Sequence, residues 1–311
     1  MSAIIHPIAP NSSASWHGQL ELDYAQRDGK TIPDRVFVQA PLKVQRPFYP
    51  EEEVCHTVML HTAGGIVGGD RLSLNVNLQP QTHALITSAA AAKIYRSNGR
   101  EAQQTTQIRV GTAACLEWLP QETIVFDGAQ YAQQLKVELE PEAVWMGWEI
   151  TRLGRSARGE RFETGYWRSK IEVWQNNAPD GGTASRRLLW VDPQGIQGGH
   201  EMMTSLHGLA GYPVIASFVF VGRGVSPELV KAARAAWHSP EKPIEPLQEE
   251  PLITLHESAH QIGVTRLRAG LLCRYRGDST LEAKRWFVRV WELVRSGELG
   301  RSVCVPRVWQ V

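Results

Sequence analysis

The sequence has few cysteines, no long hydrophobic run and almost no net charge. Its four cysteines are far apart and form no CxxC pair, which argues against a disulfide framework. No apolar stretch reaches the ~18 residues that a membrane helix needs. The longest one, Val214 to Val221, is typical of a buried strand. A net charge of +1 gives no global field that would attract nucleic acid or an anionic membrane.

The N-terminus also lacks a secretion signal, because residues 1–14 contain no basic region followed by an apolar run. We therefore expect a cytoplasmic protein. With 42% hydrophobic residues, the 311-residue chain can bury a sizeable core. Two loops are expected, a proline-rich one at 240–251 and one with a glycine pair at 176–187. Neither loop is long enough to mark a domain boundary. We expect one domain over residues 1–311, with a flexible tail at residues 1–14.

Short alternating runs predict a protein built mainly from β-strands. The stretch LSLNVNL (72–78) alternates strictly between apolar and polar residues, which is typical of a half-buried strand. Similar runs, many separated by turn residues, occur at 54–60, 84–87, 105–110, 115–119, 135–139, 144–151, 166–173 and 188–191. This spacing favours a sandwich, a barrel or a solenoid over alternating β–α units. No fixed-period repeat is visible, so periodicity alone does not establish a solenoid.

Two helices are predicted near the C-terminus. The first has Ser226 as N-cap and Pro227 at its first position, and Ser239-Pro240 ends it. The second spans about Leu281 to Val294. Its apolar residues recur at helical spacing, so one face is expected to pack on the core.

The most informative block of the sequence ends in GGIVGGD, residues 64–70. It lacks the Lys and hydroxyl of a phosphate-binding loop and precedes a strand rather than a helix, which argues against nucleotide binding. The glycine pairs Gly64-Gly65 and Gly68-Gly69 instead predict a structural turn. We expect this turn to hold Asp70 at a fixed place on the surface.

A match to HExxH, His256 to His260, raises the alternative of a zinc metallopeptidase with Glu257 as general base. The context argues against it. The segment follows a proline-rich loop, the residues after it are poor helix formers, and Arg266 stands where the third histidine of the longer motif would be.

The other polar residues form no diagnostic catalytic set. His56 and His61 are five positions apart, so a strand would place them on opposite faces. Glu160 and Glu163 lie among three arginines in a glycine-punctuated loop. Salt bridges or ligand roles are equally compatible with that pattern. The residues by themselves favour a binding or scaffolding role over catalysis.

Six blocks in order resemble one family, the urease accessory protein UreD, also called UreH. They are QRPFYPEEEVCH, GGIVGGD, LITSAAAAKIYRS, LEWLPQETIVF, LGRSARGERFETG and PRVW, and they extend over nearly the whole chain. The resemblance implies a mainly β, irregular helical (solenoid-like) fold with two helices near the C-terminus. It also implies a non-enzymatic chaperone of nickel insertion that binds the urease apoenzyme and UreF and, through UreF, the GTPase UreG.

The resemblance further implies that Ni²⁺ passes through an internal tunnel, with no tightly bound cofactor. Such a path requires sparse, weak ligands, because a full imidazole or thiolate set would trap the ion. We expect Asp70, Glu160 and Glu163 on the path, with His61 as a weaker candidate. Tyr95 and Arg96 are expected to contact a partner protein. A pure scaffold that nickel never enters remains the alternative to a conduit.

Overall fold

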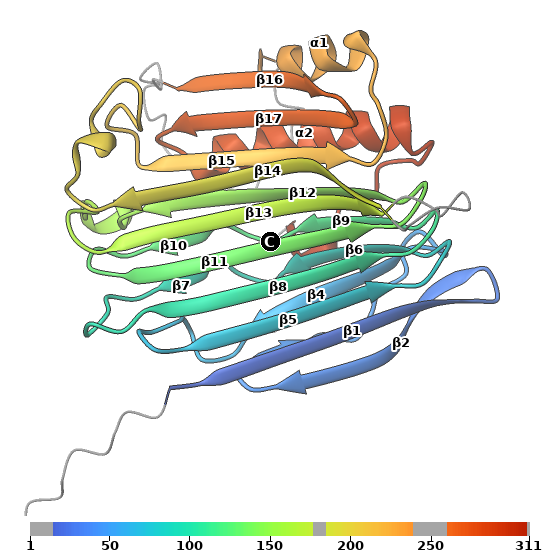
Figure 1. Ribbon diagram of the computed structural model, residues 1–311, viewed down its shortest axis with the longest axis horizontal. Helices are drawn as coiled ribbons and strands as arrows, with labels where there is room; N and C mark the ends of the chain where they lie inside the picture. The colour runs from blue at the N-terminus through green and yellow to red at the C-terminus, as the bar shows by residue number, and fades with distance from the viewer. Residues whose placement is uncertain (1–14, 177–184, 239–259, 310–311) are drawn as a thin grey trace, which may run out of the picture.

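The computed structural model describes residues 15–176, 185–238 and 260–309, and Figure 1 looks onto two stacked sheets. The front sheet, sheet A, has seven strands in the order β14 (Arg186–Gln197), β13 (Tyr166–Asn176), β11 (Gln130–Leu139), β8 (Ala102–Val110), β5 (Arg71–Leu78), β1 (His17–Arg27) and β2 (Lys30–Gln39).

The second sheet, sheet B, has ten strands. Its main path runs β16 (Gln261–Leu267), β17 (Gly270–Gly277), β15 (Val214–Val221), β12 (Val144–Leu153), β9 (Cys115–Leu119), β6 (His83–Ser88), β4 (Cys55–His61) and β3 (Leu42–Val44). The short strand β10 (Thr123–Val125) pairs with β12 and with β7 (Ala92–Ile94).

The chain alternates between the two sheets as it proceeds. From β4 it passes to β5, β6, β8, β9, β11, β12 and β13, and each of these steps changes sheet. The short strands β7 and β10 are left out of this series. Neighbours within a sheet therefore run parallel, as in the pairs β5–β8 and β6–β9. This winding is a solenoid-like arrangement of stacked coils, and antiparallel strands close it at both ends.

The alternation of side chains along each strand creates two apolar layers. Residues facing between the sheets, such as Leu74, Ile108 and Trp145, form one core cluster. In sheet B the opposite face is also apolar, and Met146, Phe218 and Leu271 belong to the second cluster, which the helices complete. Sheet B is therefore buried on both faces, which is why its strands read as nearly continuous apolar runs.

Two α-helices cover the outer face of sheet B. Helix α1 (Pro227–Ala235) begins as predicted, because the Ser226 side chain accepts a hydrogen bond from the Leu229 amide at 3.1 Å. Helix α2 (Thr280–Glu298) is longer than predicted and buries Trp286, Trp291 and Arg295. Four short 3₁₀ segments are Ser156–Arg158, Glu201–Met203, Ala236–His238 and Arg307–Trp309.

The strands predicted from alternation are confirmed, and those at 115–119 and 214–221 have the predicted bounds. The strands β1, β2, β3, β7, β10, β16 and β17 were not predicted. The predicted tail at 1–14, the prolines at 240–251 and most of the loop at 176–187 lie outside the described residues.

Candidate functional site

A cavity of about 340 Å³ lies between the two sheets. Apolar side chains such as Leu74 and Ile171 form much of its wall, but polar groups also line it, among them Gln104, Gln133, Ser169, Glu149 and His61. Segments of two sequence blocks, Gly64 to Ile66 and Ser88 to Lys93, contribute to the lining. The cavity far exceeds the ~15 Å³ of accessible volume that one water molecule requires.

Glu149 is the acidic residue that strand β12 places in this cavity. Its carboxylate accepts a hydrogen bond from Ser169 Oγ at 2.7 Å, across the gap between the sheets, and one from Thr151 at 3.3 Å. Burial raises the pKa of Glu149 to about 7, and the nearby Asp192 carboxylate adds to the rise, although the Ser169 hydrogen bond opposes it. The side chain can therefore exchange a proton near neutral pH.

His61, at the end of β4, also lines the cavity. Neither of its ring nitrogens makes a hydrogen bond to another residue in the described part of the chain, although both are buried. Burial lowers the pKa of His61, and the Asp70 carboxylate opposes this effect without cancelling it. The imidazole is thus neutral at physiological pH and has a free lone pair, as a metal ligand requires. Trp145 lines the same cavity, and its buried Nε1 also has no hydrogen-bond partner within the described residues.

Asp70 is buried, with 4% of its surface exposed, so the expected surface position is wrong. The burial follows from the turn, which folds the Val67 amide and the Trp16 amide onto the two carboxylate oxygens at 3.0 and 3.1 Å. The glycines permit this turn: Gly64 and Gly69 have positive φ, and a Cβ at Gly68 would lie 2.7 Å from the Arg100 carbonyl. Asp70 is not among the residues that line the cavity, but its hydrogen-bonded carboxylate acts electrostatically on His61.

The other predicted path residues lie apart from the cavity lining. Glu160 is partly exposed; it pairs with Arg155 and accepts the Asp127 amide at 3.1 Å, and Glu163 is exposed. Tyr95 packs edge-on against Phe126, and Arg96 pairs with Asp127 at 2.7 Å. The nickel-path roles of Asp70, Glu160, Glu163 and His61, and the partner-binding role of Tyr95 and Arg96, stay predictions.

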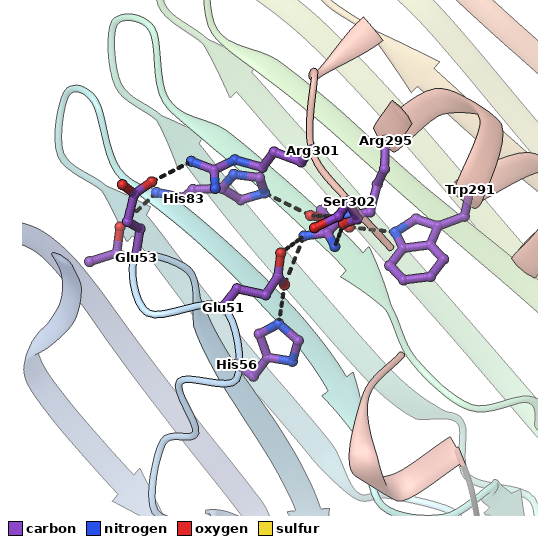
Figure 2. Close-up of polar contacts among 10 residues, drawn as sticks. Glu51, Glu53, His56, His83, Trp291, Arg295, Arg301 and Ser302 are labelled. Atoms are coloured by element: carbon purple, nitrogen blue, oxygen red, sulfur yellow. Dashed lines mark hydrogen bonds and ion pairs between the residues drawn. The ribbon is translucent and has the colours of Figure 1, made fainter. Parts of the chain in front are cut away.

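A second polar region, on the opposite face of sheet B, is a buried ionic cluster beneath α2, shown in Figure 2. At its centre the Glu117 carboxylate is fully buried; His83 Nε2 lies 2.6 Å away, Arg295 Nε donates at 3.1 Å, and Trp291 Nε1 donates as well. Burial raises the pKa of Glu117, but these hydrogen bonds, that of His83 first, outweigh it and lower the pKa below its ordinary value. The carboxylate is therefore ionised.

Arg295 connects the cluster to Glu51 (Figure 2). Its Nη2 donates to both oxygens of Glu51 at 2.9 and 2.8 Å, and its Nη1 donates to the Ser302 carbonyl at 2.9 Å. His56 Nε2 lies 2.7 Å from the Glu51 carboxylate. His56 and His61 thus occupy opposite sides of sheet B, as their odd spacing predicted.

Sequence reasoning missed Glu117, Glu149 and Arg295. A signal for the two acids was present, because each is a single carboxylate inside an otherwise apolar strand, CLEWL and VWMGWEIT. Arg295 gave no comparable signal, since basic residues are common in the last turn of a helix.

The HExxH segment does not continue as a helix. His256 and Glu257 lie outside the described residues, and directly after His260 the chain forms strand β16. The His260 ring packs against Trp237 with 4.3 Å between ring centroids. A helix carrying both histidines into a metallopeptidase site would have to end at once, which removes the support for that alternative.

The fold and the cavity define this chain as a solenoid-like β-protein with a polar cavity between its two sheets. Comparison with known proteins identifies the family: residues 17–310 match the UreD urease accessory protein family, and the chain belongs to it. A protein named urease accessory protein UreD from Nostoc punctiforme is 54% identical over 297 residues, covering 95% of this chain and 96% of the relative.

Two further relatives carry the same name. The Acaryochloris marina protein is 53% identical over 95% of this chain and 96% of its own length, and the Picosynechococcus protein is 45% identical over 99% and 97%. The family name connects this chain with urease maturation, and these relatives are named as accessory proteins rather than enzymes. None of the described helices combines the length and apolarity needed to cross a membrane.

Proposed function

We propose that this protein is a scaffold and a nickel conduit in urease maturation. It binds the urease apoenzyme and UreF, and through UreF the GTPase UreG. Ni²⁺ released by the GTPase then passes through the cavity between sheets A and B toward the urease active site. The nickel is cargo in this scheme, not a resident cofactor. The observation that carries the proposal is the inter-sheet cavity, which contains Glu149 and the ring of His61, and that ring has no hydrogen bond to another residue in the described part of the chain.

The chemistry of the cavity supports transit rather than storage. Imidazole nitrogen and carboxylate oxygen are both suitable for Ni²⁺, but two ligands in an otherwise largely amide, hydroxyl and apolar wall are too few to trap it. Because burial raises the pKa of Glu149 to about 7, its carboxyl is only partly ionised at neutral pH, and an arriving cation can displace the remaining proton. The carboxylate then holds the ion weakly, because the surrounding amide and hydroxyl groups keep it partly hydrated.

The contacts of Asp70 give it a supporting part in this proposal. Its oxygens are engaged by two backbone amides, and its negative charge acts on His61. A fixed negative charge beside the imidazole favours a cation at His61 without requiring a bond from Asp70 to the metal. This assignment makes His61 and Glu149 the ligands and Asp70 the positioning residue.

The test separates transport from assembly. Glu149→Gln and His61→Leu are expressed with the urease genes in cells, and two quantities are measured: recovery of the complex with UreF, UreG and urease, and the nickel content and activity of urease. We expect normal assembly and reduced nickel loading. Glu228→Gln, on an exposed residue of α1 outside the cavity lining, is the matched control and should leave both quantities unchanged.

Two results would contradict the proposal. Normal nickel loading in the Glu149→Gln, His61→Leu double variant would favour a pure scaffold. Loss of assembly in both single variants would mean that the cavity serves structure. Asp70→Ala is read in the same way: if loading and assembly both stay normal, Asp70 has no part in the path, and loss of assembly would make it structural.

A further inference from the structure

Glu51, His56 and Cys304 form a group of metal-ligand atoms outside the inter-sheet cavity. One carboxylate oxygen, one imidazole nitrogen and the Cys304 sulfur all lie within 4.8 Å of one another. The group lies at the outer end of the ionic cluster, where Glu51 and Cys304 are partly exposed and His56 is buried. It joins the QRPFYPEEEVCH block to the C-terminal segment, two regions that are far apart in the sequence.

Glu51, His56 and the segment that carries Cys304 are each held by contacts that need no metal. The Glu51 carboxylate is held by Arg295 Nη2, which donates to both of its oxygens. The His56 backbone is held by paired hydrogen bonds with the Phe48 backbone, each 2.9 Å. The segment that carries Cys304 is tied to the same arginine through the Ser302 carbonyl at 2.9 Å. The Glu51 carboxylate is therefore positioned without a metal, and the backbone that carries His56 and Cys304 is anchored, which lowers the ordering entropy that opposes binding.

The charge of the cluster also suits a cation. Two carboxylates, Glu51 and Glu117, share a single guanidinium, Arg295, and all three side chains are at most 9% exposed. These three groups alone, two carboxylates and one guanidinium, leave one negative charge in excess in a region of low dielectric. Because Glu117 already balances Arg295, a cation on the far side of Glu51 meets no net positive charge.

We propose that Glu51, His56 and Cys304 form a binding site for a borderline divalent transition metal such as Ni²⁺, Zn²⁺ or Co²⁺. Mixed nitrogen, oxygen and sulfur donors select these ions over Mg²⁺ and Ca²⁺, which prefer oxygen alone. The ion replaces the hydrogen bond between Glu51 and His56, whose 2.7 Å separation must widen only to about 3 Å for metal bonds of about 2.1 Å. Water completes the coordination on the exposed side.

The experiment is a titration of the purified full-length chain with Co²⁺, which reports a thiolate ligand through a charge-transfer band in the near ultraviolet. We expect one equivalent of Co²⁺ to develop the band, and Ni²⁺ and Zn²⁺ to compete for the site. Cys304→Ser should abolish the band, and His56→Gln should weaken binding at least about tenfold. Cys273→Ser, which removes a buried thiol in β17, is the matched control and should retain the band.

The proposal is overturned if the wild-type chain gives no thiolate band, or if Cys304→Ser leaves the band intact. Circular dichroism verifies that each variant is folded. If His56→Gln unfolds the chain, the partly exposed Cys304→Ser decides the question alone. The site is independent of the conduit, because Glu149→Gln should reduce nickel loading of urease while the Co²⁺ band persists.

Discussion

Beneath α2, the Glu117 carboxylate has three side-chain donors around it, and Arg295 is shared between two acids. On the cavity side of the same sheet, the His61 nitrogens and Trp145 Nε1 have no hydrogen-bond partner in another described residue, and burial raises the pKa of Glu149 to about 7. Strand β4 contributes His56 to the first region and His61 to the second. The comparison separates buried polarity that fixes the fold from buried polarity that is left free to bind.

The largest effect is expected from Arg295→Met, which retains much of the side-chain volume and removes the charge. Glu117 and Glu51 would be left buried without their cation, and breaking a buried pair in this way costs about 3–5 kcal/mol. Urea denaturation measures the free energy of unfolding. Arg301→Met is the control, because the Arg301–Glu53 pair is partly exposed and such pairs contribute less than about 1 kcal/mol.

If Arg295→Met and Arg301→Met lower the free energy of unfolding equally, the buried cluster contributes no more to stability than a surface ion pair. The distinction between the two polar regions would then fail.

Glu149→Gln should have the opposite effect on stability, and the effect should depend on pH. The pKa of Glu149 rises from 4.5 in the unfolded chain to about 7 in the fold, so the folded state binds more protons between these values. Stability from this group is therefore present below pH 4.5 and is lost as pH rises through 7. Above that pH we expect Glu149→Gln to be more stable than the wild type by about 3 kcal/mol.

Denaturation at a series of pH values tests this effect, and Ser169→Ala provides a matched variant. It retains the carboxyl but removes the hydrogen bond that opposes the pKa rise, so the loss of stability should move to higher pH. If the wild type and Glu149→Gln have the same free energy of unfolding at every pH, burial in the cavity does not penalise the charged carboxylate.

Histidine-to-leucine substitutions should differ in sign between the two regions. His61→Leu removes two buried nitrogens that bond to no other described residue and should stabilise the fold by about 1–2 kcal/mol. His83→Leu removes the hydrogen bond to Glu117 and should destabilise it by a similar amount, about 1–2 kcal/mol. Thermal unfolding of both variants measures the difference, and destabilisation by both would show that His61 is as well satisfied as His83.

Much of the fold follows from local pattern, and its winding does not. The runs at 115–119 and 214–221 predict strands because all but one of the residues in each are apolar, and Ser226-Pro227 predicts the start of α1 because the cap is local. The assignment of successive strands to alternate sheets depends on contacts between residues that are distant in the sequence. The sequence contains no fixed-period repeat that would predict it. The short strands β7 and β10 have three residues each, too few for any periodic signal.

The sites follow the same division. The turn at 64–70 could be predicted because glycine pairs have a local meaning, but not the burial of Asp70, which depends on the amide of Trp16, 54 positions away. The Arg295 contacts to Glu117 and Glu51 span 178 and 244 positions. Only the fold brings such residues together, although a lone acid in an apolar strand, as at Glu117 and Glu149, could have been singled out beforehand.

The smallest effect is expected at Glu160, which represents a third kind of charged residue. Its carboxylate is partly exposed and pairs with Arg155, whose side chain is 36% exposed, so the pair is screened by water and salt. Glu160→Gln should cost less than about 1 kcal/mol, and added salt should reduce the difference. Urea denaturation at low and high ionic strength measures it, with Glu163→Gln as the exposed control.

The same variant also tests the predicted path. Because Glu160 is engaged by Arg155 and by the Asp127 amide and does not line the inter-sheet cavity, we expect normal nickel loading of urease in Glu160→Gln. Reduced loading with intact assembly would extend the path from the cavity to this loop. The division between satisfied and unsatisfied polar groups would then fail as a guide to the route, since a carboxylate with two partners would still carry the ion.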